Sequence, residues 1–149
     1  MQEFSRRQSL AIAAGLGAAL FARGAFAETN PATDEAIKRF SGGRAPAAGK
    51  VALDIPEIAE NGNMVPVGVK VESPMTDQSY VSEIMILAPA NPTPTATTLK
   101  LTPMAGNADV STRIRLAKTM TVMALAKMND GSVYIDKKDV KVTAGGCGG

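Results

Sequence analysis

The chain contains no histidine and no tryptophan, and its single cysteine is Cys147. Without histidine, neither a Ser-His-Asp nor a Cys-His catalytic site can be built. Structural and catalytic zinc sites usually take several cysteine or histidine ligands. We therefore expect no metal, no other cofactor and no enzymatic activity of its own. One cysteine also excludes an internal disulfide, and in an exported protein it indicates an intermolecular bond or a reactive thiol.

Aromatic residues are also scarce, at 4% of the chain, and the formal net charge is only +2. That small excess comes from residues 1–27, which hold three arginines and one glutamate, so the rest of the chain is close to neutral. Nucleic-acid-binding domains generally carry a clustered basic surface. We expect no nucleic acid among the partners of this protein.

The first 27 residues have the pattern of an export signal. Arg6 and Arg7 precede a short apolar run rich in alanine and glycine, which ends at Ala25-Phe26-Ala27. A charged start, an apolar centre and a small-x-small site are typical of a signal peptide, and the paired arginines indicate twin-arginine export. The alternative is an N-terminal core helix; the run is too short and interrupted for a membrane span. We expect cleavage after Ala27 and a periplasmic protein that does not contact the membrane.

A short helix is expected next, at Thr33–Phe40, with Thr33 as its N-cap and Ser41-Gly42-Gly43 as its end. Residues 28–49 would form this helix and a linker of alanine, proline and glycine from Arg44 to Gly49. Residues 50–143 would then form one β domain, and residues 144–149 a flexible C-terminal arm.

Apolar residues on every second position predict half-buried strands across the β domain. Met120–Met128 is apolar at nearly every position and is expected to be a central strand or to be covered by another subunit. Two segments are expected outside the strands, a proline-containing loop at Ala88–Ala96 and a solvated turn at Asp136–Asp139. The pattern predicts an all-β fold, an immunoglobulin-like antiparallel β-sandwich of about eight strands with a short N-terminal helix. The expected strands lie at 51–55, 65–71, 80–87, 99–101, 110–116, 120–128, 133–135 and 140–142.

The chain ends in Gly145-Gly146-Cys147-Gly148-Gly149. Glycine maximises backbone freedom, and no neighbour in sequence could pack against the thiol. An extended arm would place Cys147 roughly 13–14 Å beyond Thr143, on a chain thin enough to enter a narrow channel. No nearby residue activates the thiol, so it is interpreted as a handle for cargo rather than as a nucleophilic active site. The alternative is a tail whose cysteine forms an interchain disulfide.

This tail resembles the C-terminal motif of the SoxY family, the sulfur-carrier subunits of the thiosulfate-oxidising Sox system. The resemblance extends to further segments, which include Gly49–Val51, Pro56–Asn63, Val65–Val67, Ser73–Thr76, Val110–Arg115 and Asp130–Val133. It implies that Cys147 is the covalent attachment point for sulfur and that Gly145, Gly146, Gly148 and Gly149 give the arm freedom and access.

The resemblance also implies partners. SoxZ would be a second immunoglobulin-like subunit, and the cytochrome pair SoxXA would join thiosulfate oxidatively to the cysteine. SoxB would then remove the terminal sulfonate as sulfate, and in some organisms SoxCD would oxidise the remaining sulfane sulfur. The rival interpretations are an immunoglobulin-like interaction subunit with an interchain disulfide and a metal or redox protein. The methionines are interpreted as core or interface filling rather than as copper ligands, and Glu57 and Glu60 are given no catalytic role.

Overall fold

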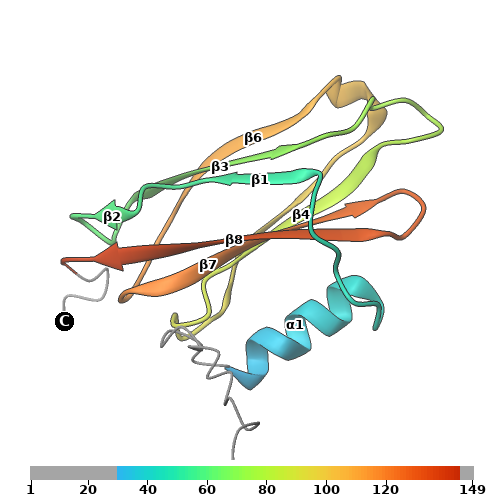
Figure 1. Ribbon diagram of the computed structural model, residues 1–149. Coiled ribbons are helices and arrows are strands. Elements are labelled where there is room, and N and C mark those ends of the chain that lie inside the picture. The colour runs from blue at the N-terminus through green and yellow to red at the C-terminus, as the bar shows by residue number, and fades with distance from the viewer. Residues whose placement is uncertain (1–29, 145–149) are drawn as a thin grey trace, which may run out of the picture.

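The structure is a computed structural model, and it describes residues 30–144. Two β-sheets pack face to face, with one helix outside them (Figure 1). The smaller sheet has the order β1-β3-β6 and the larger the order β2-β8-β7-β4-β5. The predicted immunoglobulin-like β-sandwich is confirmed, and one detail differs because β2 pairs with β8 in parallel. The elements are α1 (Pro31–Ser41), β1 (Val51–Asp54), β2 (Ile58–Ala59), β3 (Val65–Val71), β4 (Val81–Leu87), β5 (Thr95–Lys100), the 3-10 helix η1 (Pro103–Ala105), β6 (Ala108–Ile114), β7 (Met120–Met128) and β8 (Val133–Val142).

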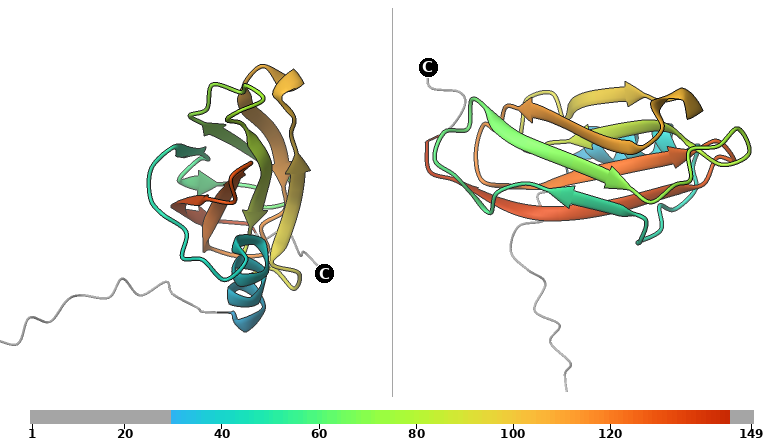
Figure 2. Two further views of the ribbon diagram at one scale, coloured as in Figure 1. Left: turned by 90° about the vertical axis from the view of Figure 1, so that its right-hand side faces the viewer. Right: turned by 90° about the horizontal axis from the view of Figure 1, so that it is seen from above.

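The main core lies between the two sheets. In β3 the predicted alternation is confirmed, since the four valines at 65, 67, 69 and 71 are buried and the residues between them are exposed or partly exposed. On the opposite sheet, Val122 and Ala124 of β7 are fully buried and belong to the same core. Fully burying a valine side chain stabilises the fold by about 1.5–3 kcal/mol, so the four valines of β3 together contribute strongly to the stability of the sandwich. Figure 2 shows the two layers from the end and from above.

The strand β7 is central in its sheet, as its sequence predicts, with β4 on one side and β8 on the other. Its second apolar face packs against the helix α1 of the same chain. Leu125 of β7 packs in a smaller cluster with Phe40 of α1 and Val133 of β8. The ammonium of Lys127 lies 4.5 Å from the centre of the Phe40 ring and 3.4 Å from the carboxylate of Glu83. The helix therefore closes the outer face of the larger sheet.

The start of α1 differs from the prediction. Its N-cap is Asn30, whose side-chain oxygen accepts a hydrogen bond from the backbone N–H of Ala32 at 3.0 Å. Thr33 lies inside the helix and is buried, so the prediction that it caps the helix is wrong. Asparagine ranks above threonine as an N-cap, and Pro31 follows at a position that needs no N–H. The end is as predicted, because Gly42 takes a left-handed backbone conformation there.

The predicted turn at Asp136–Asp139 is wrong, because these residues lie within the continuous strand β8 and pair with Thr121–Ala124. The charged run was interpreted as a turn because its residues disfavour strands. Asp136 explains part of the exception. Its carboxylate accepts a hydrogen bond from the backbone N–H of Leu53 at 2.8 Å. Leu53 lies on β1, at the edge of the other sheet, so this bond joins the two sheets.

Two connecting segments also differ from the sequence interpretation. The predicted linker Arg44–Gly49 is attached to the larger sheet, because Ala47 forms a parallel bridge opposite Tyr134. Its N–H donates to the Val133 carbonyl and its carbonyl accepts from the Ile135 N–H, each at 2.9 Å. The predicted loop at Ala88–Ala96 is shorter, since β5 already begins at Thr95. Within residues 30–144 no helix is long and apolar enough to cross a membrane.

Of the methionines that the structure describes, four are buried, two are exposed and Met123 is partly buried. Met75, Met85, Met120 and Met128 are buried, as the core interpretation predicts. Met64 and Met104 are 63% and 96% exposed, so these two do not fill the core, and an interface role for them stays a prediction. Both lie outside the strands, in a turn before β3 and in η1, where no facing layer can cover them.

Candidate functional site: the root of the C-terminal arm

The site residues expected from the sequence lie outside the described residues 30–144. They are Cys147 with Gly145, Gly146, Gly148 and Gly149 at one end of the chain, and Arg6, Arg7 and Ala27 at the other. The structure does describe the segment that leads to the cysteine, namely the end of β8 followed by Thr143 and Ala144. We call these last two residues the root of the arm.

The root is held by the segment Glu57–Gly62. Three backbone hydrogen bonds connect the two segments, from Lys141 N–H to the Glu57 carbonyl at 2.8 Å, from Thr143 N–H to the Ala59 carbonyl at 3.1 Å, and from Gly62 N–H to the Ala144 carbonyl at 2.8 Å. The Thr143 hydroxyl adds a bond to the Glu60 carbonyl at 3.3 Å. This ladder continues the parallel pairing of β2 with β8, so the backbone is fixed up to Ala144.

The other side of β8 is held as well. The backbone N–H of Val142 donates to the Thr119 hydroxyl at 3.0 Å. The loop that contains Thr119 connects β6 to β7. Two different loops therefore hold the last residues before the arm, one on each side of the strand.

The two loops are also joined to each other. The backbone N–H of Leu116 donates to the Gly62 carbonyl at 2.7 Å, and the guanidinium of Arg115 donates to the Asn63 side chain at 3.1 Å. The Asn91 side chain then connects the next loop, donating to the Arg115 carbonyl at 2.6 Å and accepting from the Ala117 N–H at 2.9 Å. We call the residues Glu57–Met64, Arg115–Thr119 and Thr143–Ala144 the arm-root platform.

The arm-root platform lies at one end of the sandwich, and η1 lies at the other, as Figures 1 and 2 both show. Two large apolar side chains of the platform face solvent, Ile58 at 59% and Met64 at 63% exposure. Glu57, Glu60 and Lys141 beside them are exposed too. The platform thus combines a fixed backbone with two exposed apolar side chains and with exposed charged residues near them in the sequence.

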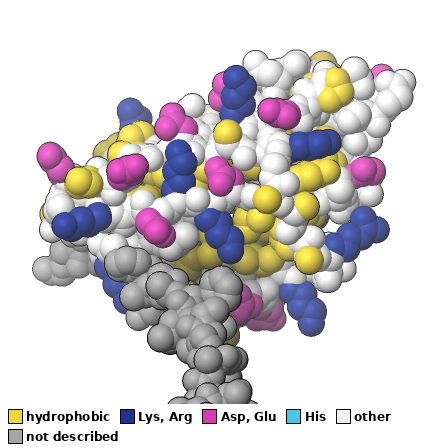
Figure 3. All heavy atoms as spheres, viewed as in Figure 1, with side chains coloured by type: hydrophobic (Ala, Val, Ile, Leu, Met, Phe, Trp, Pro, Cys, Tyr) yellow, Lys and Arg dark blue, Asp and Glu magenta, His cyan; other side chains and the backbone are white. Residues whose placement is uncertain are grey.

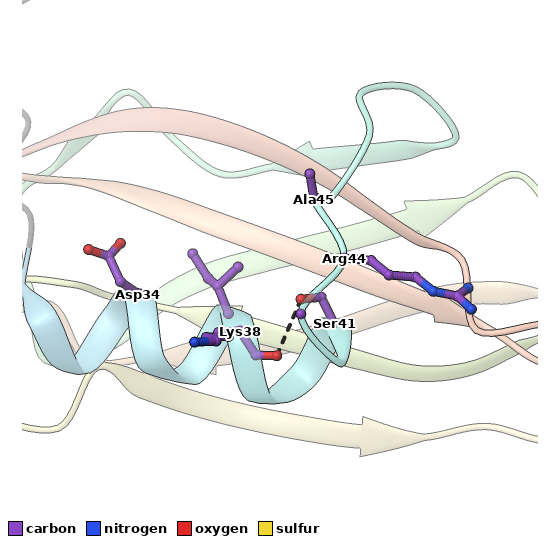
Figure 4. A pocket seen from close by; sticks show the side chains of 7 residues that line it. Asp34, Lys38, Ser41, Arg44 and Ala45 are labelled. Carbon is purple, nitrogen blue, oxygen red and sulfur yellow. Dashed lines mark hydrogen bonds between the residues drawn. The ribbon is translucent and has the colours of Figure 1, made fainter.

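A depression beside α1 offers no comparable chemistry. Its volume is about 230 Å³, and its lining includes Asp34, Lys38, Ser41 and Arg44 (Figure 4). The Ser41 hydroxyl is already bonded to the Lys38 carbonyl at 3.4 Å. Arg44 is close to the β7–β8 hairpin at Gly131, which lies at the end of the sandwich away from the root.

Charged side chains elsewhere in residues 30–144 form no cluster of metal-binding residues. No group of three or more aspartates, glutamates, cysteines or histidines is placed there to hold a metal ion. In the β7–β8 hairpin, hydrogen bonds from the Ser132 hydroxyl and backbone N–H lower the pKa of the Asp130 carboxyl. This is ordinary turn chemistry at an exposed position. Basic and acidic side chains alternate over the face in Figure 3, so that face presents no field of one sign.

Sequence reasoning missed the positioning residues of the platform. The residues Glu60-Asn61-Gly62-Asn63 have the composition of a turn, and the Asn61 side chain closes this turn by accepting from the Asn63 N–H at 2.9 Å. Sequence reasoning did not predict that this turn holds the root, nor that Asn91, Arg115 and Thr119 join it. Two segments that carried the family resemblance, Pro56–Asn63 and Val110–Arg115, meet at the platform through the bond from Arg115 to Asn63. Their shared resemblance is the sequence feature that could have indicated these positioning residues.

Comparison with known proteins gives a family. The family described as sulfur oxidation protein SoxY matches residues 37–147, a range that includes Cys147. This chain belongs to the SoxY family. Its fold is also similar to the sulfur carrier protein SoxY from Chlorobium limicola f thiosulfatophilum, with a TM-score of 0.61 and 32% identity over 76% of this chain and 97% of that one.

Other similar structures show the fold alone. A superoxide reductase (neelaredoxin) from Ignicoccus hospitalis has a TM-score of 0.56 and 18% identity over 63% of this chain and 80% of that one. A putative superoxide reductase from Thermotoga maritima has a TM-score of 0.52 and 16% identity over 69% and 89%. Among curated proteins no match is found. The SoxY membership confirms the resemblance seen in the sequence.

Proposed function

We propose that this protein is a covalent sulfur carrier of the thiosulfate-oxidising Sox system, with Cys147 as the attachment point. The observation that carries the proposal is the SoxY family match over residues 37–147, since this range includes the only thiol of the chain. The similar SoxY of Chlorobium limicola is itself described as a sulfur carrier protein. The root geometry supports the proposal, because a fixed stem ends just before a glycine-rich tail.

The proposed loading step forms one bond. The Cys147 thiol loses its proton, and its sulfur bonds to the outer sulfur of thiosulfate. Two electrons leave, and a c-type cytochrome pair of the SoxXA kind accepts them. A hydrolase of the SoxB kind then adds water to the terminal sulfonate, releases sulfate and two protons, and leaves a persulfide on Cys147. The chemistry belongs to the partners, and this chain holds and presents the group without acting as an enzyme.

We further propose a location and a partner. The arginine pair and the Ala25-Phe26-Ala27 site support twin-arginine export to the periplasm. This route carries folded cargo, so a SoxZ subunit without its own signal would travel bound to this chain. The glycines at 145, 146, 148 and 149 would leave the thiol accessible to several partners in turn.

The test is thiosulfate loading of the purified complex with SoxZ by a SoxXA cytochrome. Intact-mass analysis should show a thiosulfate adduct on the wild-type chain and none on the Cys147→Ser variant. The circular dichroism spectrum and SoxZ binding of the variant should be unchanged, because the substitution lies outside the sandwich. A Cys147→Ser chain that still supports thiosulfate oxidation would refute the proposal. A wild-type chain that forms only interchain disulfides would favour the structural alternative.

A further inference from the structure

We propose that the arm-root platform is the docking surface for the enzymes that act on the group bound to Cys147. The rim around a recessed active site would seat on Ile58 and Met64 while the arm enters the channel below. The inference rests on the proposed function and adds the surface that the partner enzymes recognise.

The cysteine is close to the root along the chain. Cys147 follows Ala144 by three residues, and the backbone of Ala144 is fixed by its bond from the Gly62 N–H. An extended chain spans at most about 3.3–3.6 Å per residue, so the cysteine lies within about 11 Å of the Ala144 Cα. An enzyme whose reacting atoms lie several ångströms below its surface can meet the cysteine only when its rim touches the root. The residues around Ala144 must then lie in the contact.

The segment that holds the root exposes apolar side chains. Ile58 and Met64 are exposed large apolar side chains, and both belong to the segment that pairs with the root. Exposed Glu57 and Glu60 lie beside them. An apolar centre with a polar rim is the usual anatomy of a protein–protein contact. Methionine also adapts its shape to different partners, which suits a surface that several enzymes use in turn.

The backbone of the platform is held in place by hydrogen bonds. The hydrogen bonds among Gly62, Leu116, Asn63 and Arg115 fix the platform before any partner arrives. A preordered surface loses little conformational entropy on docking. Docking there would also place the Ala144 root at a defined position over the channel.

The experiment compares three single charge substitutions, Ile58→Glu, Met64→Glu and Met104→Glu, in the full chain bound to SoxZ and loaded with thiosulfate. Met104 is the matched control, because it is 96% exposed and lies in η1 at the far end of the sandwich (Figure 1). The measurement is the KM and kcat of a SoxB hydrolase for the loaded carrier. We expect Ile58→Glu and Met64→Glu each to raise KM about tenfold. Neither kcat nor the rate of Cys147 alkylation by iodoacetamide should change, and Met104→Glu should leave all three quantities at wild-type values.

A second measurement separates docking from misfolding. Inserting six alternating glycine and serine residues after Ala144 adds about 20 Å of reach, so the partner no longer needs to touch the root. The longer arm alone lowers the effective concentration of the cysteine, and the comparison is therefore made at equal arm length. With the insertion, the KM ratio of Ile58→Glu to wild type should fall from about ten towards one. A misfolded platform would keep the ratio high.

Two failures are distinguishable. If Cys147→Ser still takes up thiosulfate, both the proposed function and this inference are overturned. If Cys147 is loaded normally and the Ile58 and Met64 variants match Met104→Glu in KM, the carrier function stands and the docking surface is refuted. A KM penalty that persists unchanged with the longer arm also refutes docking at the root.

Discussion

Replacing Val122 with aspartate should test how strictly the sandwich depends on its central strand. Val122 has no exposed surface and packs in the core between the sheets. Val122 pairs directly with Lys138 of β8, and paired residues of an antiparallel ladder point to the same face of the sheet. The Lys138 side chain is nevertheless exposed to solvent. Lys138 can therefore neutralise a new charge at position 122 only if its ammonium group moves into the core.

The magnitude follows from two separate costs. Losing the burial of the valine side chain costs about 1.5–3 kcal/mol, and burying a polar group without partners adds about 1–3 kcal/mol. These two costs apply equally to Val122→Asn, which is the matched neutral control. The charge of aspartate adds to them, because each unit by which burial raises its pKa costs about 1.4 kcal/mol at neutral pH. Since domains of this kind unfold with about 5–15 kcal/mol, Val122→Asp should be largely unfolded at pH 7.

The pH dependence has a definite sign. Burial would raise the folded-state pKa of an aspartate at position 122 above its unfolded value of about 3.9. Below the unfolded pKa both states are protonated, so Val122→Asp and Val122→Asn should be equally stable. As pH rises above the unfolded pKa, the unfolded state releases its proton while the folded state keeps it. The aspartate variant therefore loses stability relative to asparagine until the pH passes the folded pKa, above which the difference is constant.

Urea unfolding followed by circular dichroism, at several pH values from 3 to 8, measures this difference. A gap between the two variants that widens with pH would support a dry, unpaired site at position 122. The reasoning fails if Val122→Asp unfolds within about 1 kcal/mol of wild type at pH 7, or if the gap does not depend on pH. Thr121→Asp, on the opposite and partly exposed face of the same strand, should show a much smaller effect and serves as a position control.

Two further predictions concern the chain ends. Gly146→Val should leave Cys147 reactive towards iodoacetamide but lower its turnover by Sox enzymes at least severalfold, because a branched side chain stiffens and widens the arm; turnover at the wild-type rate would exclude threading through a narrow channel. The functional protein isolated from cells should begin near Glu28, as Edman sequencing or N-terminal mass analysis would show, and a functional chain that retains Met1 would exclude cleavage after Ala27.

The sandwich was predictable because its period-two pattern is strong. The valines of β3 and the apolar run of β7 each indicate burial directly from sequence, and both lie where expected. The errors arose where tertiary contacts override local preference. Asp136 lies in a strand because the Leu53 N–H on the other sheet needs an acceptor, and no local pattern reports a partner 83 residues away.

The platform was not predictable for a related reason. Asn91 and Thr119 are ordinary loop residues in the sequence, and Arg115 lies near the end of an expected strand. Each becomes a positioning residue only through a contact with a distant segment. Turn chemistry at Glu60–Asn63 predicts that the chain reverses but not what the reversed backbone faces. The parallel pairing of β2 with β8 decides that, and a two-residue strand carries too little pattern to be recognised.

The hydrogen bonds at the root also bear on how tightly a carrier can bind its enzymes. A residue that is free in solution loses about 1–2 kcal/mol of backbone entropy when it is fixed in a complex. If the four residues Lys141–Ala144 were free, ordering them would cost docking about 4–8 kcal/mol in all. Their bonds to Glu57, Ala59, Thr119 and Gly62 fix them during folding instead, so this cost is met once and not at each encounter. A carrier built in this way binds each enzyme well enough to react and weakly enough to leave. Removing the hydrogen bonds of Thr143 to the Ala59 and Glu60 carbonyls should therefore weaken binding to all partner enzymes together rather than to one of them.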